Sequence, residues 1–254
     1  PERDGRPPPW CNGGPVRALA IIPAFNEERS LPAVVEGIRR DAPGVDVCVV
    51  DDGSSDGTAA VARGLGATVL SLPLNLGIGG AVQAGYRWAR DHGYDAAIQV
   101  DGDGQHDTAF LPGLLAAVGP GRADLAVGSR FAGPRIEGAF RSTWSRRMGI
   151  RYLSVALRLR CGARVLDPTS GFRAAGRRAI ELFARSYPPD YPEPESIAVA
   201  ARAGLRVVEV PVRMTERVHG ESSIDLGRSV YYLVKVSMAL VLLPTRLPAD
   251  EEPA

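Results

Sequence analysis

Short apolar runs alternate with amphipathic segments across the first half of the 254-residue chain. ALAIIPAF (18–25) precedes a segment in which apolar residues recur at helical spacing, and VDVCVV (45–50), ATVLSL (67–72) and DAAIQV (95–100) each lead through a polar turn into another helical pattern. Strands that alternate with helices in this way predict a parallel sheet in a doubly wound α/β fold. With 45% hydrophobic residues, the chain can build one sizeable core, so we expect a single domain.

The second half of the chain is less regular. ADLAVGSRF (123–131) and LRVVEVPVRM (205–214) predict further strands, and residues 141–162 predict a basic amphipathic helix. DPTSGFRA (167–174) is rich in turn-forming residues, so we expect an exposed loop there.

The two ends of the chain differ from this pattern. Residues 1–16 are rich in Pro and Gly without an apolar signal core, which predicts a disordered leader before a domain at 17–228. The last part, 229–254, contains the most apolar stretch, VYYLVKVSMALVLLP, which is shorter than the roughly 20 residues of a membrane helix. This apolar or amphipathic helix either completes the core, lies on a membrane surface or is a truncated anchor.

Charge and cysteine content exclude several classes of protein. The 30 basic and 29 acidic residues nearly cancel, so no global field suggests nucleic acid as a partner. Cys11, Cys48 and Cys161 are odd in number and far apart, which argues against a disulfide framework or a zinc site. We therefore expect a cytoplasmic protein.

Polar clusters follow three of the predicted strands. PAFNE (23–27), DDGSSDG (51–57) and DGDGQHD (101–107) each begin where an apolar run ends. Ligands of open α/β sheets bind outside the carboxyl ends of the strands, so three neighbouring strands would bring these clusters to one edge. This convergence is the main functional signal of the sequence.

The DGDGQHD cluster allows four interpretations. An EF-hand is excluded because His106 and Pro112 occupy the positions that require Gly and Glu. A haloacid dehalogenase-type phosphatase is disfavoured by Gln105 at a position usually held by Thr or Val, and by a chain whose only lysine is Lys235. A solvated turn and a divalent cation bound by Asp103 and Gln105 beside a diphosphate both remain open.

The other clusters also carry alternatives. Asp52 is suited to accept a hydrogen bond from a nucleobase, whereas Ser55 or Asp56 is expected to cap the next helix. Phe25 and Glu27 are suited to contact a nucleoside, whereas Asn26 and Glu27 would equally begin the following helix. The glycines of NLGIGGAVQAG (75–85) lack a dinucleotide or Walker pattern, and tight helix packing explains them equally well.

Seven motifs in order carry a resemblance: PAFNE, VVDDGSSDGT, NLGIGGAVQAG, VDGDGQHD, VGSRF, DPTSGFR and RVHGESSI, between residues 23 and 224. Together they resemble the family 2 glycosyltransferases of the dolichyl-phosphate mannose synthase type. The resemblance implies a GT-A fold, a single Rossmann-like domain with a mostly parallel sheet and helices on both faces. It also implies a nucleotide diphosphate sugar donor, such as GDP-mannose or a UDP-glucose-like compound, and Mg²⁺ or Mn²⁺.

Residue roles follow from the same resemblance. The implied donor-binding residues are Pro23, Ala24, Phe25, Glu27, Asp52, Gly79, Asp101, Gly102, Asp103 and Arg217. Asp101, Asp103 and Gln105 would bind the metal, with Asp101 to Asp103 as the DxD motif. The implied catalytic residues are Asp101, Asp103, Asp167 and Arg130, and the implied acceptor-binding residues are Arg130, Arg147 and Ser170.

Some of these roles have competing explanations. Arg146 competes with Arg147 for the same place, and Ser223 stands where relatives often have Lys. A solvated basic face would also explain the arginines, and Asp167 would also serve as a turn former.

The predicted reaction is an inverting, metal-dependent transfer of a sugar to a polyprenyl phosphate, with peripheral contact to the inner face of the cell membrane. A soluble acceptor is the first alternative. A metal-dependent sugar-phosphate phosphatase and a non-catalytic nucleotide-sugar binding protein are more distant ones.

Overall fold

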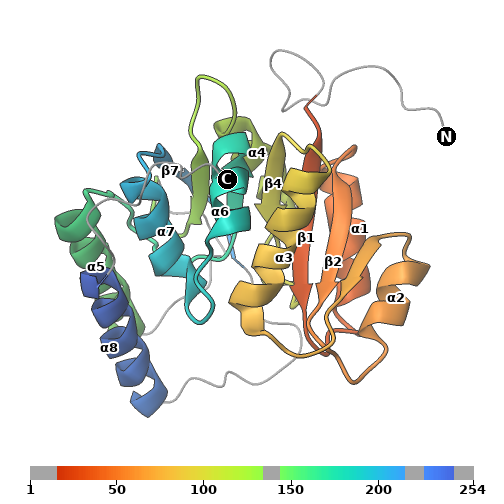
Figure 1. Ribbon diagram of the computed structural model, residues 1–254, viewed down its shortest axis with the longest axis horizontal. Coiled ribbons are helices and arrows are strands. Elements are labelled where there is room, and N and C mark those ends of the chain that lie inside the picture. The colour runs from red at the N-terminus through yellow and green to blue at the C-terminus, as the bar shows by residue number, and fades with distance from the viewer. Residues whose placement is uncertain (1–15, 134–143, 215–225, 243–254) are drawn as a thin grey trace, which may run out of the picture.

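A computed structural model describes residues 16–133, 144–214 and 226–242, which form an α/β structure around one seven-stranded sheet (Figure 1). The strands are β1 (Ala18–Ala24), β2 (Asp46–Asp51), β3 (Thr68–Ser71), β4 (Ala96–Gln99), β5 (Leu125–Ser129), β6 (Arg173–Gly176) and β7 (Val207–Pro211). Their order is β3-β2-β1-β4-β6-β5-β7, and β6 is antiparallel to β4 and β5 whereas all other pairs are parallel. The predicted mostly parallel α/β fold is confirmed.

Helices cover both faces of the sheet. One face carries α1 (Leu31–Asp41), α2 (Thr58–Gly64), the short 3₁₀ helix η1 (Thr108–Phe110) and α4 (Leu111–Ala117). The other carries α3 (Gly77–Asp91), α5 (Trp144–Cys161), α6 (Arg177–Arg185), α7 (Pro192–Arg202) and α8 (Leu226–Leu242). Strand β1 alternates between the two cores: Leu19 and Ile21 pack toward α3, whereas Ala20 and Ile22 pack toward α1.

Close packing explains one glycine of the NLGIGGAVQAG motif. A Cβ atom on Gly85 would lie 2.3 Å from Cγ2 of Ile21, so only glycine allows α3 to approach β1 this closely. The tight-packing interpretation of this motif therefore holds at Gly85.

Helix α8 contributes to the core, which is one of the alternatives that the sequence left open, and it also has exposed apolar side chains. Val236 and Leu240 are buried in the core, whereas Val234 and Met238 on the same helix are exposed. Figure 1 shows α8 beside α5 at one end of the molecule. Among the helices of the described ranges, none combines the length and hydropathy needed to cross a bilayer.

Candidate active site

The three polar clusters meet at one edge of the sheet, as expected from their positions at strand ends. The backbone N–H of Asp52 donates to the carbonyl oxygen of Ala24 at 2.9 Å. On the other side of β1, the carbonyl oxygen of Pro23 lies 3.3 Å from where a Cβ of Gly102 would stand. Since neighbouring strands are about 4.8 Å apart, the ends of β2 and β4 lie roughly 10 Å from each other across β1. One nucleoside diphosphate is long enough to span them.

Reciprocal hydrogen bonds lock the first two clusters together. The N–H of Asn26 donates to Oγ of Ser54 at 3.0 Å, and the N–H of Ser55 donates to Oδ1 of Asn26 at 2.9 Å. Asn26 adopts a φ angle of +57°, which lies in the left-handed region. Residues other than glycine rarely adopt this conformation, and Asn adopts it more readily than most of them. This residue therefore joins two loops, and the alternative that it begins a helix is wrong because α1 starts at Leu31.

The polar residues that precede α2 and α1 make local hydrogen bonds near the starts of these helices. The N-cap of α2 is Gly57, without a side-chain hydrogen bond, so neither Ser55 nor Asp56 is the N-cap residue; Oδ1 of Asp56 instead accepts from the backbone N–H of Thr58, the first residue of α2, at 2.9 Å. The carboxylate of Glu27 accepts from the hydroxyl of Ser30, just before α1. Glu27 also lies beside Gly102, since a Cβ there would come within 3.5 Å of its Cγ. Its expected donor contact stays a prediction.

Asp52 is buried, and its carboxylate holds the loop that leads into α3. Oδ1 accepts from the backbone N–H of Leu76 at 2.7 Å. Burial raises the pKa of this carboxyl above its ordinary value, against the hydrogen bonds from Leu76 and Gly77. Exposed apolar side chains follow β1 (Phe25), follow β3 (Leu74 and Leu76) and lie in the first turn of α3 (Ile78). A carboxylate with apolar neighbours is suited to bind a nucleobase.

We expect Asp52→Asn to weaken nucleotide binding without destabilising the fold. The Asn oxygen can still accept from Leu76, but it lacks the charge that a base N–H prefers. Because the folded protein keeps the Asp52 proton to a higher pH than the unfolded chain, wild-type stability falls as pH rises from 3.8 through the raised pKa. The variant should not show this contribution. Denaturant titrations on both sides of this interval, with nucleotide titration at neutral pH, test the prediction; a variant that binds nucleotide like wild type would contradict it.

The DGDGQHD loop presents oxygen atoms at the end of β4. Oδ1 of Asp103 accepts from the N–H of Gln105 at 3.0 Å, and Oδ1 of Asp101 accepts from Nε2 of Gln99 at 3.1 Å. Gly171 lies against this loop, since a Cβ there would be 3.2 Å from Oδ2 of Asp101. The sequence reasoning missed Gln99, although a polar residue at the end of an apolar strand is a usable signal.

The donor atoms of this loop fit Mg²⁺ or Mn²⁺. Asp101, Asp103 and Gln105 offer hard oxygen ligands within five residues. Within the described ranges, no three His, Cys, Asp or Glu side chains are grouped as a metal site. A cation beside a diphosphate takes one or two carboxylates from the protein and other oxygens from the diphosphate and water.

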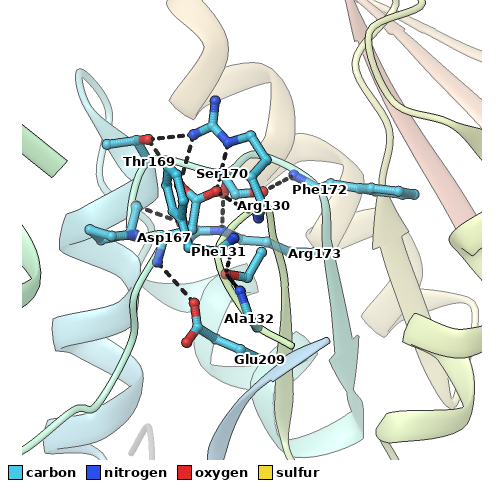
Figure 2. Close-up of polar contacts among 11 residues, drawn as sticks. Arg130, Phe131, Ala132, Asp167, Thr169, Ser170, Phe172, Arg173 and Glu209 are labelled. Carbon is cyan, nitrogen blue, oxygen red and sulfur yellow. Dashed lines mark hydrogen bonds and ion pairs between the residues drawn. The ribbon is translucent and has the colours of Figure 1, made fainter. Parts of the chain in front are cut away.

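The 167–172 loop is buried, so the prediction of an exposed loop is wrong. Asp167 has no exposed surface, and its carboxylate accepts from Arg130 at two atoms, Nε and Nη2, both at 2.7 Å (Figure 2). Arg130 Nη2 also donates to Oγ1 of Thr169 at 3.0 Å. Turn residues are commonly exposed, but here partners from distant segments satisfy their polar groups.

Two charged residues that were not among the predicted site residues, Arg173 and Glu209, form hydrogen bonds with the backbone of this loop. Arg173 is almost fully buried and donates from Nε to the carbonyl of Ser170 at 2.6 Å and from Nη2 to that of Pro168 at 3.1 Å. Glu209 of β7 accepts from the N–H of Asp167 at 2.8 Å (Figure 2). A single carboxylate within the apolar strand VVEVP was the available signal for Glu209.

The remaining predicted residues fall in different places. Gly79 is buried at the start of α3, where a Cβ would lie 2.2 Å from the carbonyl oxygen of Pro188. Ser170 is buried and its Oγ accepts from the N–H of Phe172 at 3.3 Å. Arg147 is exposed on α5. Arg217, Ser223 and the side chain of Arg146 lie outside the described residues.

Comparisons with known proteins agree with this geometry. A family model described as glycosyl transferase family 2 matches residues 19–182. Undecaprenyl-phosphate mannosyltransferase of Micrococcus luteus is 38% identical over 222 residues, which cover 84% of this chain and 89% of that protein. Polyprenol monophosphomannose synthase of Mycolicibacterium smegmatis is 36% identical over 219 residues, which cover 82% and 81%.

A solved structure extends the comparison to the fold. Glucosyl-3-phosphoglycerate synthase from Mycobacterium tuberculosis, crystallised with Mn²⁺ and UDP-glucose, superposes with a TM-score of 0.69. The two sequences are 26% identical, and the alignment covers 90% of this chain and 80% of that one.

Proposed function

The chain belongs to glycosyltransferase family 2, and from this we propose that it transfers a sugar from a nucleotide diphosphate sugar to a polyprenyl phosphate. Its fold is the GT-A arrangement expected from the sequence. The observation that carries the proposal is the convergence of Asp52, Asp101 and Asp103 on one edge of the sheet, on either side of β1. The names of the two relatives described above support the choice of a polyprenyl phosphate.

The proposed donor site extends from β2 to β4. The carboxylate of Asp52 binds the base, and the diphosphate lies toward Asp101 and Asp103. Bound there, Mg²⁺ or Mn²⁺ would neutralise the charge that develops on the leaving nucleoside diphosphate. Asp101, Asp103 and Gln105 are the residues that would hold the ion.

The transfer would be a single displacement with inversion at the anomeric carbon. A phosphate nucleophile is already anionic at neutral pH, so it needs no general base. In agreement, both carboxylate oxygens of Asp167 are engaged by Arg130, which makes Asp167 unsuited to remove a proton. We propose that Asp167 orients Arg130, whose Nε and Nη2 are engaged by Asp167 and Thr169 while the remaining nitrogen, Nη1, points away from the carboxylate (Figure 2). Nη1 would bind phosphate.

Helices α5 and α8 offer a surface for a lipid substrate. Their exposed apolar side chains are Met148, Tyr152, Val155 and Leu159 on α5, and Val234, Met238, Val241 and Leu242 on α8. The hydroxyl of Tyr152 lies 2.9 Å from that of Ser237, so the two rows are joined. Neither helix contains an acidic residue, and Arg147, Arg151 and Arg158 of α5 are exposed. An apolar surface with basic neighbours suits the inner face of a membrane that contains anionic lipid.

We expect the double substitution Leu159→Glu and Met238→Glu to lower binding to anionic phosphatidylglycerol vesicles by roughly tenfold or more. Each change removes an apolar side chain worth about 1.5–3 kcal/mol on burial, and it adds a repelled charge. Cosedimentation at low and high salt measures the effect, and wild-type binding should weaken with salt. Leu74→Glu, which alters an exposed leucine elsewhere, is the control. Equal binding by all three proteins would contradict a membrane surface on α5 and α8.

A transfer assay tests the function itself. Purified protein is incubated with GDP-sugars and UDP-sugars, short-chain polyprenyl phosphate or 3-phosphoglycerate, and Mg²⁺ or Mn²⁺ or neither. We expect a glycosylated polyprenyl phosphate and a released nucleoside diphosphate, with metal present. Transfer only to 3-phosphoglycerate would favour the alternative of a soluble acceptor. Release of inorganic phosphate from a sugar phosphate, with no nucleotide in the assay, would favour a phosphatase. Donor binding without turnover would indicate a binding protein.

A further inference from the structure

His106 lies where three segments of the candidate active site meet. The backbone N–H of Asp101 donates to its Nδ1 at 3.0 Å. Its ring stacks on Phe172 of the buried loop, with 4.6 Å between ring centroids and 9° between planes. Its backbone forms an antiparallel bridge with Met214, just beyond β7. The side chain is buried, so these contacts are shielded from water.

The His106 ring also lies near the carboxylate of Asp101. Because Nδ1 accepts a hydrogen bond, the neutral ring carries its proton on Nε2. That atom is 3.5 Å from Oδ2 of Asp101, which is longer than an ordinary N–H···O hydrogen bond. The other carboxylate oxygen, Oδ1, accepts from Gln99 at 3.1 Å. Asp101 is therefore held at its backbone by His106 and at Oδ1 by Gln99, and Nε2 of His106 is the ring atom near Oδ2.

Asp107, the residue after His106, makes a second connection to the segment that follows β7. Asp107 accepts from Nε and Nη2 of Arg213, at 2.9 and 2.6 Å through Oδ2. His106 is thus bridged to Met214 through the backbone, and Asp107 is paired with Arg213 through the side chains. The DGDGQHD loop has fixed contacts with the 167–172 loop on one side and with the end of β7 on the other.

We propose that His106 is a positioning residue, which orients Asp101 for the metal and keeps the DGDGQHD loop in register with the 167–172 loop. The inference rests on the proposed function, because it takes Asp101 to be a ligand of the metal ion that binds the donor diphosphate. Groups that hydrogen-bond to metal ligands fix the direction of the ligand atoms, and their loss typically costs about 10- to 100-fold in metal affinity or activity. A ring that served only to fill space would act through its volume and its stacking on Phe172.

Two substitutions separate these roles. His106→Phe keeps an aromatic ring for Phe172 but has no polar atom for Asp101. His106→Gln loses the stacking but can place an amide donor near Oδ2 of Asp101. Mn²⁺ affinity is measured from the electron paramagnetic resonance signal of free Mn²⁺, with Mn²⁺ alone and with added GDP or UDP. Donor kcat and KM and the thermal unfolding midpoint are measured on the same samples. His92→Phe is the matched control, since His92 is exposed beside α3.

We expect His106→Phe to weaken Mn²⁺ binding by about 10- to 100-fold and to lower kcat, with His106→Gln closer to wild type than to the Phe variant. His92→Phe should bind Mn²⁺ like wild type. If His106→Phe does not fold, His106→Leu takes its place, because leucine also has no polar atom for Asp101. The inference is overturned if a folded His106→Phe binds Mn²⁺ with wild-type affinity, or if His106→Gln is folded but binds as weakly as the Phe variant. A wild-type protein that binds no Mn²⁺ with either nucleotide overturns the proposed function and this inference with it.

Discussion

Asp103→Asn should lower the rate of sugar transfer by roughly 10³-fold or more while the protein stays folded. The substitution keeps the shape of the side chain and an oxygen that can accept from the N–H of Gln105. It removes the negative charge with which Asp103 would hold a divalent cation beside the diphosphate. A bound cation contributes several kcal/mol to stabilising the leaving group, and each 1.36 kcal/mol is a factor of ten in rate.

Initial rates in the transfer assay, with far-UV circular dichroism of the same samples, measure this effect. Asp91→Asn is the matched control, because Asp91 is an exposed carboxylate at the end of α3 and pairs with Arg90. The control should transfer sugar at the wild-type rate. A folded Asp103→Asn protein with wild-type activity would show that the DGDGQHD loop does not bind a catalytic metal.

Asp167→Ala should lower the free energy of unfolding by about 3–5 kcal/mol, the usual cost of removing one partner from a buried ion pair. The Arg130 side chain is only 8% exposed, and without Asp167 its charge would lose both hydrogen bonds to the carboxylate. The double substitution Arg130→Met with Asp167→Ala removes the uncompensated charge. The double variant should therefore be more stable than Asp167→Ala alone.

Urea-induced unfolding of the single and double variants tests this expectation. Arg178→Ala is a suitable comparison, because Arg178 pairs with Asp124 at 3.1 Å but is 64% exposed, and such surface pairs contribute about 1 kcal/mol or less. If Asp167→Ala is no less stable than Arg178→Ala, the pair does not stabilise the fold. If the double variant is no more stable than Asp167→Ala, the buried charge is not the source of the loss.

This ion pair connects stability with the proposed chemistry. The carboxylate that holds Arg130 belongs to a loop whose next glycine, Gly171, touches Asp101 of the DxD motif. A side chain at Gly171 would press on that carboxylate, just as one at Gly102 would press on the carbonyl oxygen of Pro23. The DGDGQHD loop thus has little room to shift on either side. Such packing is what a pre-organised site requires.

The sequence by itself determined the elements whose cause is local. Apolar runs that end in PAFNE, DDGSSDG and DGDGQHD predicted strands with polar ends, and the parallel alternation of strands and helices predicted that these ends share an edge. A local hydrogen bond of Asp56 near the start of α2 was likewise predictable, since its partner Thr58 is two residues away, although the N-cap itself is Gly57. In each case the deciding contacts lie between near neighbours in the chain or follow from a regular pattern.

Only the tertiary structure decided the second half of the site. Strand β6 has four residues, RAAG, without alternation, and it enters antiparallel between β4 and β5. That placement buries the 167–172 loop and brings Asp167 to Arg130, 37 residues away, and to Glu209, 42 residues away. It also sets Phe172 against His106. No local pattern encodes these pairs, because they depend on the order of strands in the sheet, and the burial that makes their hydrogen bonds strong arises only once the sheet has formed.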